Sequence, residues 1–218
     1  AAILNAEQGP IYIGKGAILN ERAVLKGPVA IGAGTRINAN AVVRNATTIG
    51  PHTRIGGEVS NSVILGYSNK AHEGFLGNSV VGEWCNLGAG TNTSNLRNDY
   101  REVKVWDYGQ EDFGNTNLQF CGLFMGDHSK CSIHTMFNTG TVVGVSANLF
   151  GAGFTDRFVP SFAWGSPDRY MQTYRLDRAL EVAKCVTRRR SIQFGAEDKA
   201  ILTHIFRATA MRRVKDLA

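Results

Sequence analysis

The sequence predicts an all-β solenoid of hexapeptide repeats, and three observations support this fold class. Apolar residues recur at every sixth position without a slip from Ile13 to Ile55, and the same spacing returns from Met125 to Leu149. Glycine is frequent, with 25 residues, whereas proline is scarce, with 5. Within the spacing of six lies a longer period of 18, in which an aliphatic residue is followed by glycine. A helix would give a period of about 3.6 and a single strand a period of 2, so neither explains the pattern.

Three hexapeptides make one coil of 18 residues, which predicts three short faces and three corners per coil. The apolar residue of each hexapeptide points inward, and stacked coils bury a continuous column of aliphatic side chains. Glycine or asparagine near a corner, as at Asn20 and Asn38, supplies a backbone conformation that a β-carbon would strain. The aliphatic–glycine pairs that mark successive coils are Ile13-Gly14, Ile31-Gly32, Ile49-Gly50, Met125-Gly126 and Val143-Gly144.

The repeat is interrupted twice, and the interruptions set the predicted domain organisation. The frame shifts between Glu58 and Lys70, and it stops over residues 95–117, a long, charged and aromatic segment. A loop of this length in a tight solenoid is usually functional. After Gly153 the coils end. We therefore expect a β-helical domain over residues 1–157 that carries an inserted loop at 95–117.

Residues 158–218 are expected to form a connection and two C-terminal helices. Apolar residues at helical spacing predict one helix over about 172–188 and a second over about 197–217. Helices at this position would cap the open end of the solenoid and cover its exposed strand edge.

Charge and cysteine usage narrow the function classes. The net charge of +6 comes entirely from Tyr174 onward, where 11 Lys and Arg face 5 Asp and Glu. A solvated helix face or a contact for an acidic small molecule explains this surplus better than nucleic-acid binding.

The four cysteines show no CxxC pair and are expected to be reduced thiols of a cytoplasmic protein. No run of 18 apolar residues predicts a membrane span, and no signal peptide is recognisable.

Two motifs suggest a metal site and a nucleotidylyltransferase signature, but the repeat explains both. His128 and His134 are six residues apart, which in this fold places them on successive faces, so no metal site is expected. The run from Gly32 to Arg36 looks like the GxGTR signature of sugar nucleotidylyltransferases, but Ile31 and Ile37 place it inside an ordinary hexapeptide.

The segment from Lys70 to Phe75, followed by LGNSVVGEWCNLGAGTNTSNLRNDY, carries a resemblance to a known family. It resembles the acetyltransferase half of the bifunctional glucosamine-1-phosphate N-acetyltransferase / sugar-1-phosphate nucleotidylyltransferase family, in its archaeal-type branch. The likeness continues through LFMGDHSKCSIHTMFNTGTVVG and covers about two thirds of the chain. The resemblance implies a left-handed parallel β-helix with a C-terminal helical extension. It also implies transfer of an acetyl group from acetyl-CoA to glucosamine-1-phosphate or galactosamine-1-phosphate, without a metal.

The resemblance also assigns roles to residues. His72 matches the general base that takes the proton of the sugar amine, a task that suits a neutral imidazole. Asn95 matches an asparagine that hydrogen-bonds the reacting groups. Arg101 and Lys104 match two basic residues that hold the sugar phosphate. Phe75 stands where the branch has tyrosine, so one polar contact to substrate is missing.

Further residues are expected to contact the two substrates. Arg54 is a candidate for assisting the phosphate, with a solvated face as the alternative. Small residues where the pantetheine arm of CoA approaches the backbone are Ala89, Gly90, Gly126, Gly144 and Ser146, each of which could instead be a simple corner residue. The resemblance further implies a homotrimer with its active sites between neighbouring prisms.

We expect the nucleotidylyltransferase half to be absent from this sequence, which would make the chain either a fragment of a bifunctional protein or a stand-alone transferase. The main alternative function is a non-catalytic trimerisation or regulatory β-helix attached to a nucleotidylyltransferase. Phe75 and the extra residues between Val105 and Leu118 favour this alternative. The joint presence of His72, Asn95, Arg101 and Lys104 argues against it.

Overall fold

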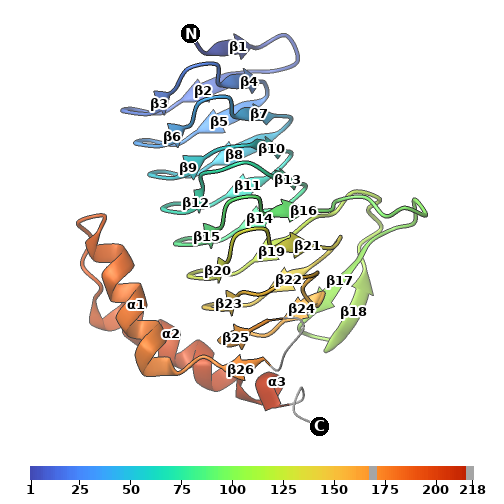
Figure 1. The fold of residues 1–218 in the computed structure, drawn as a ribbon, viewed down its shortest axis with the longest axis vertical. Coiled ribbons are helices and arrows are strands. Elements are labelled where there is room, and N and C mark those ends of the chain that lie inside the picture. Colours follow the sequence, from blue (N-terminus) through green and yellow to red (C-terminus); the bar gives the residue numbers. More distant parts are fainter. Residues whose placement is uncertain (167–170, 215–218) are drawn as a thin grey trace.

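The computed structural model describes residues 1–166 and 171–214, which form a left-handed parallel β-helix with a C-terminal helical extension (Figure 1). The chain winds through three parallel sheets in turn, here called sheets A, B and C, and so builds a triangular prism. The fold class predicted from the hexapeptide spacing is confirmed.

The strands are short and stack in register from coil to coil. Sheet A contains β1 (Ile3–Asn5), β4 (Val24–Lys26), β7 (Val42–Arg44), β10 (Glu58–Ser60) and β13 (Phe75–Gly77), and this face continues with the pair β16 (Asn92–Thr93) and β21 (Met136–Phe137). Sheet B contains β2 (Ile11–Ile13), β5 (Val29–Ile31), β8 (Thr47–Ile49), β11 (Val63–Ile64), β14 (Val80–Val81), β19 (Phe124–Met125), β22 (Val142–Val143) and β24 (Phe158–Val159). Sheet C contains β3 (Ile18–Leu19), β6 (Arg36–Ile37), β9 (Arg54–Ile55), β12 (Asn69–Lys70), β15 (Asn86–Leu87), β20 (Lys130–Cys131), β23 (Asn148–Leu149), β25 (Ala163–Gly165) and β26 (Gln172–Thr173).

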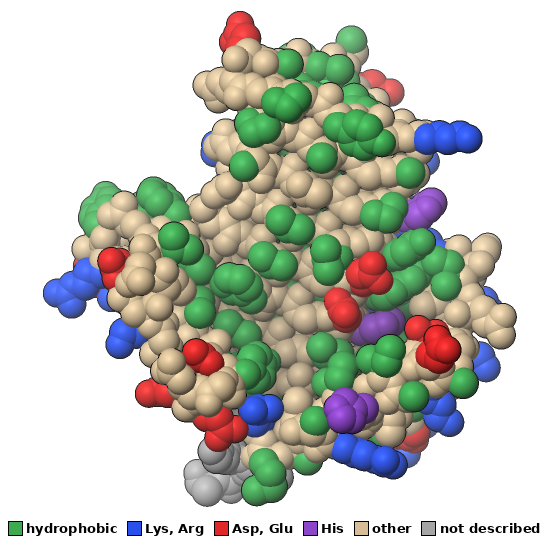
Figure 2. All heavy atoms as spheres, turned by 180° about the vertical axis from the view of Figure 1, so that it is seen from behind, with side chains coloured by type: hydrophobic (Ala, Val, Ile, Leu, Met, Phe, Trp, Pro, Cys, Tyr) green, Lys and Arg blue, Asp and Glu red, His purple; other side chains and the backbone are tan. Residues whose placement is uncertain are grey.

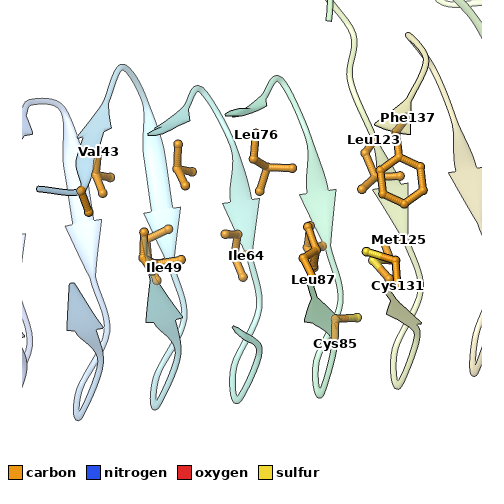
Figure 3. Packing of buried hydrophobic residues seen from close by; sticks show 14 of the residues in the cluster. Val43, Ile49, Ile64, Leu76, Cys85, Leu87, Leu123, Met125, Cys131 and Phe137 are labelled. Atoms are coloured by element: carbon orange, nitrogen blue, oxygen red, sulfur yellow. The ribbon is translucent and has the colours of Figure 1, made fainter. Parts of the chain in front are cut away.

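The core is the predicted column of inward-facing side chains (Figure 3). Every sixth residue from Leu25 to Ile55 is at most 1% exposed, and every sixth residue from Met125 to Leu149 is at most 4% exposed. Ile13, in the first coil, is 38% exposed because no coil covers that end. Burial of such side chains stabilises the fold by about 1.5–3 kcal/mol each.

The corner between sheets B and C carries a column of residues with positive φ. The first two positions are Gly16 and Gly34, as expected for this conformation. The next four are aromatic or imidazole side chains, which the sequence did not predict at a corner: His52, Tyr67, Trp84 and His128. Their rings stack with centroid separations of 5.2, 4.3 and 6.2 Å. This stacking offsets part of the cost of the left-handed backbone conformation. His134 lies at the next corner, between sheet C and β21, as the spacing of six predicts.

The frame shift at residues 58–70 arises from shortened corners. The corner between β9 and β10 consists of Gly56 and Gly57 alone. As a result Lys70 falls at an inward-facing position of sheet C, opposite Ile55. A lysine therefore stands where the neighbouring coils place Ile55 and Leu87.

The insertion forms an antiparallel hairpin of β17 (Lys104–Asp107) and β18 (Asp112–Asn115), which projects from the corner between sheets A and B (Figure 1). It folds back on later coils of its own chain, because the ring of Trp106 stacks on that of Phe158 at 4.1 Å. Arg157 adds a hydrogen bond from its guanidinium to the carbonyl of Lys104.

The C-terminal part differs from the prediction in three respects. The coils continue past residue 157, since β24 and β25 extend sheets B and C to Gly165. The first helix, α1 (Leu176–Arg188), begins later than predicted because residues 172–173 pair as β26 along the edge of β25. The predicted second helix is two helices, α2 (Ala196–Ala208) and α3 (Ala210–Val214), which meet at Thr209; its predicted end at 215–217 lies outside the described residues.

The helices lie beside the prism as well as below its end (Figure 1). Phe162 of the last coil packs with Ala179, Ala183 and Leu202 in a second apolar cluster, against which Val145 is also packed. Seen from behind, most charged side chains on that side lie over the lower half of the molecule, where the hairpin and the helices are (Figure 2). Among the described residues, no helix combines the length and hydrophobicity needed to cross a membrane.

Candidate active site

His72 lies in the corner that joins β12 of sheet C to β13 of sheet A, and its side chain is exposed. The short corner of the preceding coil lies against this segment. A β-carbon on Gly56 would come within 2.2 Å of the carbonyl oxygen of Ala71, and one on Gly57 within 2.6 Å of that of Gly74. Only glycine permits this close approach, so the Gly56–Gly57 pair sets the position of the corner that carries His72.

A cavity of about 440 Å³ opens beside this corner, and we call it the His72 cavity. It brings together three of the residues singled out from the sequence: His72, Arg54 and Ala89. Its other wall comes from the last turn of α1 and from the two residues after its end, Arg189 and Arg190. The sequence identified this arginine run as a basic surplus but could not show that α1 folds back onto the coils beside His72.

The His72 cavity is strongly positive. The guanidinium of Arg190 donates a hydrogen bond to Asn69 Oδ1 at 3.3 Å. Its pKa is lowered from the usual arginine value, first by burial and then by the nearby positive charges of Arg54 and Arg189. Within residues 1–166 and 171–214, none of these three guanidinium groups lies within ion-pair distance of a carboxylate. Three unneutralised guanidiniums around one cavity favour a phosphorylated ligand.

Asn95 and Phe75 lie in a different cavity, at the corner between sheets A and B. This second cavity has a volume of about 920 Å³ and is here called the Asn95 cavity. Asn95 Nδ2 donates to Asn78 Oδ1 at 2.7 Å, which fixes the orientation of its amide. The ring of Phe75 lies over Gly77, where an added β-carbon would be 2.3 Å from its Cζ. His72 and Asn95 thus flank β13 at opposite ends, and one chain does not bring them into a common cavity.

Arg101 and Lys104 line neither cavity. Arg101 follows the corner and has a side chain that is 81% exposed, with its Nε 3.7 Å from Asp99 Oδ2. Asp99 is paired more closely with Arg97, at 2.7 Å, which the sequence did not single out. A hydrogen bond from that guanidinium holds the pKa of the Asp99 carboxyl well below its usual range. Lys104 begins β17 and is exposed.

The small residues predicted to contact CoA are divided between two corners. Ala89 lines the His72 cavity, and Gly90 follows it with a φ of 70°, packed so closely on His134 that a β-carbon would meet the imidazole ring. Gly126, Gly144 and Ser146 lie instead at the corner between sheets B and C. Ser146 is 3% exposed, so its side chain is inaccessible from outside this chain.

One buried group at the site was missed from the sequence. Lys70 precedes His72 by two residues, and its ammonium lies inside the corner. The signal that could have identified it is a lysine at an inward position of the repeat, but the frame shift at residues 58–70 concealed that position.

Comparison with known proteins supports the resemblance found in the motifs. No family model matches the chain. It is 36% identical over 103 residues to the bifunctional sugar-1-phosphate nucleotidylyltransferase/acetyltransferase of Sulfurisphaera tokodaii, and 33% identical over 104 residues to the bifunctional protein GlmU of Methanocaldococcus jannaschii. These alignments cover 47% and 48% of this chain, less than the two thirds predicted, and 25% of each relative. The chain therefore spans about a quarter of the length of these relatives.

A comparison with solved structures found acyltransferases at low sequence identity. The N-acyltransferase AntD from Bacillus cereus, in complex with dTDP and 3-hydroxybutyryl-CoA, matches with a TM-score of 0.47 and 12% identity over 83% of this chain and 91% of its own. The polySia-specific acetyltransferase NeuO matches with a TM-score of 0.47 and 14% identity over 88% of this chain and 97% of its own.

Proposed function

We propose that this chain is an acyltransferase that moves an acetyl group from acetyl-CoA to the amino group of a hexosamine-1-phosphate. The observation that carries the proposal is the His72 cavity, in which an exposed imidazole faces a site bordered by three unneutralised guanidinium groups. An imidazole can accept the proton of an amine, and guanidinium groups bind phosphate. The Sulfurisphaera tokodaii relative, whose name includes acetyltransferase, supports the same chemistry.

In this mechanism His72 acts as the general base. The sugar nitrogen attacks the thioester carbonyl carbon, the new N–C bond forms, and the imidazole takes the proton that the nitrogen loses. The tetrahedral intermediate then collapses with cleavage of the C–S bond. The thiolate of CoA leaves and takes the proton back from the imidazolium, which restores neutral His72.

The guanidinium groups of Arg54, Arg189 and Arg190 hold phosphate groups of the substrates, because each presents a planar fork of donors to phosphate oxygens. Ala89 offers a wall without a bulky side chain, along which the pantetheine arm of CoA can pass. Gly90 supports that wall from behind, through its contact with His134.

Asn95 contributes from a second copy of the chain in a homotrimer. His72 and Asn95 lie at opposite ends of β13, so an active site that uses both needs the Asn95 cavity of a neighbouring prism beside the His72 cavity. Asn95 would then donate to the developing oxyanion. Arg101 and Lys104, which are exposed near the Asn95 cavity, would reach the sugar phosphate across the same interface.

The test is release of CoA thiol from acetyl-CoA, with glucosamine-1-phosphate and galactosamine-1-phosphate as paired acceptors. The parent protein should turn over with at least one acceptor, and His72→Gln should lose on the order of 10²–10⁴-fold in kcat, the usual contribution of a general base. His52→Asn is the matched control, because His52 is also an exposed corner histidine but lies at another corner. Equal rates for His72→Gln and the parent would refute the base assignment.

The second candidate function is a non-catalytic β-helix that trimerises or regulates a nucleotidylyltransferase in a longer protein. The bifunctional relatives, of which this chain covers a quarter, favour it, as does Phe75 in place of tyrosine. A folded protein that releases no thiol with either acceptor and binds no acetyl-CoA would support this candidate instead.

A further inference from the structure

Lys70 is a buried lysine in the interior of the prism. It is 2% exposed and lies in the column of sheet C opposite Ile55, on the inward side that Leu87 and Cys131 occupy in later coils. An ammonium is costly to bury unless hydrogen bonds replace its water. Its position therefore needs compensating partners, and the structure shows what they are.

The ammonium of Lys70 is surrounded by backbone carbonyl oxygens. Its Nζ donates to the carbonyl of His72 at 2.5 Å, to that of Gly56 at 3.1 Å and to that of Glu73 at 3.3 Å. Three donors meet three acceptors, so the hydrogen-bonding capacity of the ammonium is used completely. Two of these acceptors belong to the corner that carries His72, and the third belongs to the short corner packed against it.

The rest of this corner is held in the same way. Asn38 reaches past the short corner and donates from Nδ2 to the carbonyl of Ala71 at 2.8 Å. The carbonyl of Glu73 also accepts from the backbone N–H of Gly90, at 3.1 Å. All three carbonyls of residues 71–73 are thereby bonded, although the segment belongs to no strand or helix. Lys70 supplies the only side-chain donor that reaches the carbonyl of His72 itself among the described residues.

We propose that Lys70 is a positioning residue whose ammonium fixes the backbone of residues 71–73 and so holds the imidazole of His72 at the mouth of the cavity. This inference rests on the proposed function in one respect, the role of His72 as base. Lys70 does not touch substrate. Its effect on the reaction comes through the geometry of the corner, and a displacement of a catalytic group by about 1 Å can cost on the order of 100-fold in rate.

The charge state of Lys70 gives the proposal a distinctive pH dependence. Burial lowers the pKa of Lys70 to about 8, while Glu73 and the Cys131 thiol, the titratable groups that face it, oppose this decrease. Above pH 8 the folded protein loses the proton, whereas the unfolded chain keeps it until about pH 10.5. The unfolded state binds more protons in this interval, so stability increases with pH. Activity should change in the opposite direction, because the neutral amine has only two donors for three carbonyls.

The experiment compares Lys70→Met and Lys70→Arg with Lys130→Met. Lys130 is the matched control, since it is partly buried and also donates to a histidine carbonyl, that of His128 at 2.8 Å, but at another corner. Lys70→Met should lower kcat by about 10- to 100-fold with little change in KM, because the arginines of the cavity remain. Lys70→Arg, which keeps a charged donor, should recover part of kcat, and Lys130→Met should retain the kcat of the parent.

Two further measurements separate positioning from a loss of stability. From pH 7 to 9.5 the kcat of the parent should decrease relative to that of Lys70→Met, while the melting temperature of the parent increases relative to that of the same variant. Amide hydrogen exchange of residues 71–75 should be faster in Lys70→Met than in Lys130→Met. Unchanged exchange there, or a kcat that follows the melting temperature, would overturn the proposal. If the parent shows no acyl transfer at all, the proposed function fails, and the exchange measurement still decides whether Lys70 holds the corner.

Discussion

Replacing Arg190 by glutamine should weaken the binding of phosphorylated substrates while the folded state remains intact. Arg190 lines the His72 cavity and is partly buried. A hydrogen bond to a charged group contributes about 1.5–3 kcal/mol, which corresponds to an increase in KM on the order of 10- to 100-fold. Burial and the positive charges of Arg54 and Arg189 lower the pKa of Arg190, so the guanidinium groups of the cavity repel one another. Removal of one cation should therefore leave the unliganded melting temperature unchanged or slightly increased.

The assay measures thiol release as a function of each substrate, together with the increase in melting temperature that inorganic phosphate produces. Phosphate should stabilise the parent more than Arg190→Gln, because ligand binding to the native state increases stability. Arg178→Gln is the matched control: Arg178 belongs to α1, which ends two residues before Arg190, but it is exposed and pairs with Glu181 at 3.0 Å. An unchanged KM for both substrates in Arg190→Gln, or an equal loss in Arg178→Gln, would refute the assignment of the cavity.

Two further predictions concern stability. Trp84→Ala removes a ring stacked 4.3 Å from Tyr67 and should decrease the free energy of unfolding by about 3–5 kcal/mol in urea titrations, whereas a loss below about 1 kcal/mol would show that the stacked column contributes little. Burial lowers the pKa of His128 to about 4; the positive charge of Lys130 adds to this decrease and Asp198 opposes it. As the pH falls, the unfolded chain therefore binds the proton before the folded protein does. The free energy of unfolding should decrease as the pH falls from 6.5 to 4. Comparison with His128→Asn, which suits the φ of 59° at this position, isolates the contribution of the imidazole, and identical pH dependence of the two proteins would contradict the prediction.

The sequence predicted the prism because its spacing of six is a direct consequence of the geometry. In the regular coils from Leu25 to Ile55 the inward side chain of each face is apolar, so the spacing of six is visible in the sequence itself. The corners were less predictable. Trp84 adopts a left-handed conformation that glycine or asparagine usually fills, and it does so because neighbouring rings stack on it, which is a contact between coils.

The candidate site was predictable only residue by residue. The motif around His72 and Ala89 identified one wall of the cavity, but Arg189 and Arg190 reach it through the packing of α1, which no local pattern encodes. The sequence also did not show that His72 and Asn95 line two separate cavities, because this depends on which corner of the coil each residue occupies. The motif included Lys70 but did not reveal that its side chain is buried, since its inward orientation results from the loss of residues at the Gly56–Gly57 corner.

The proposed homotrimer requires His72 of one chain and Asn95 of another to act in the same active site. The most direct measurement is thiol release by assemblies formed from equal amounts of His72→Ala and Asn95→Ala chains, unfolded and refolded together. Each variant alone should be nearly inactive, but a mixed assembly contains interfaces with one intact His72 and one intact Asn95. Random mixing in a cyclic homo-oligomer predicts recovery of about a quarter of the parent activity. Recovery near that value would support the shared site, and mixed assemblies as inactive as the single variants would contradict it.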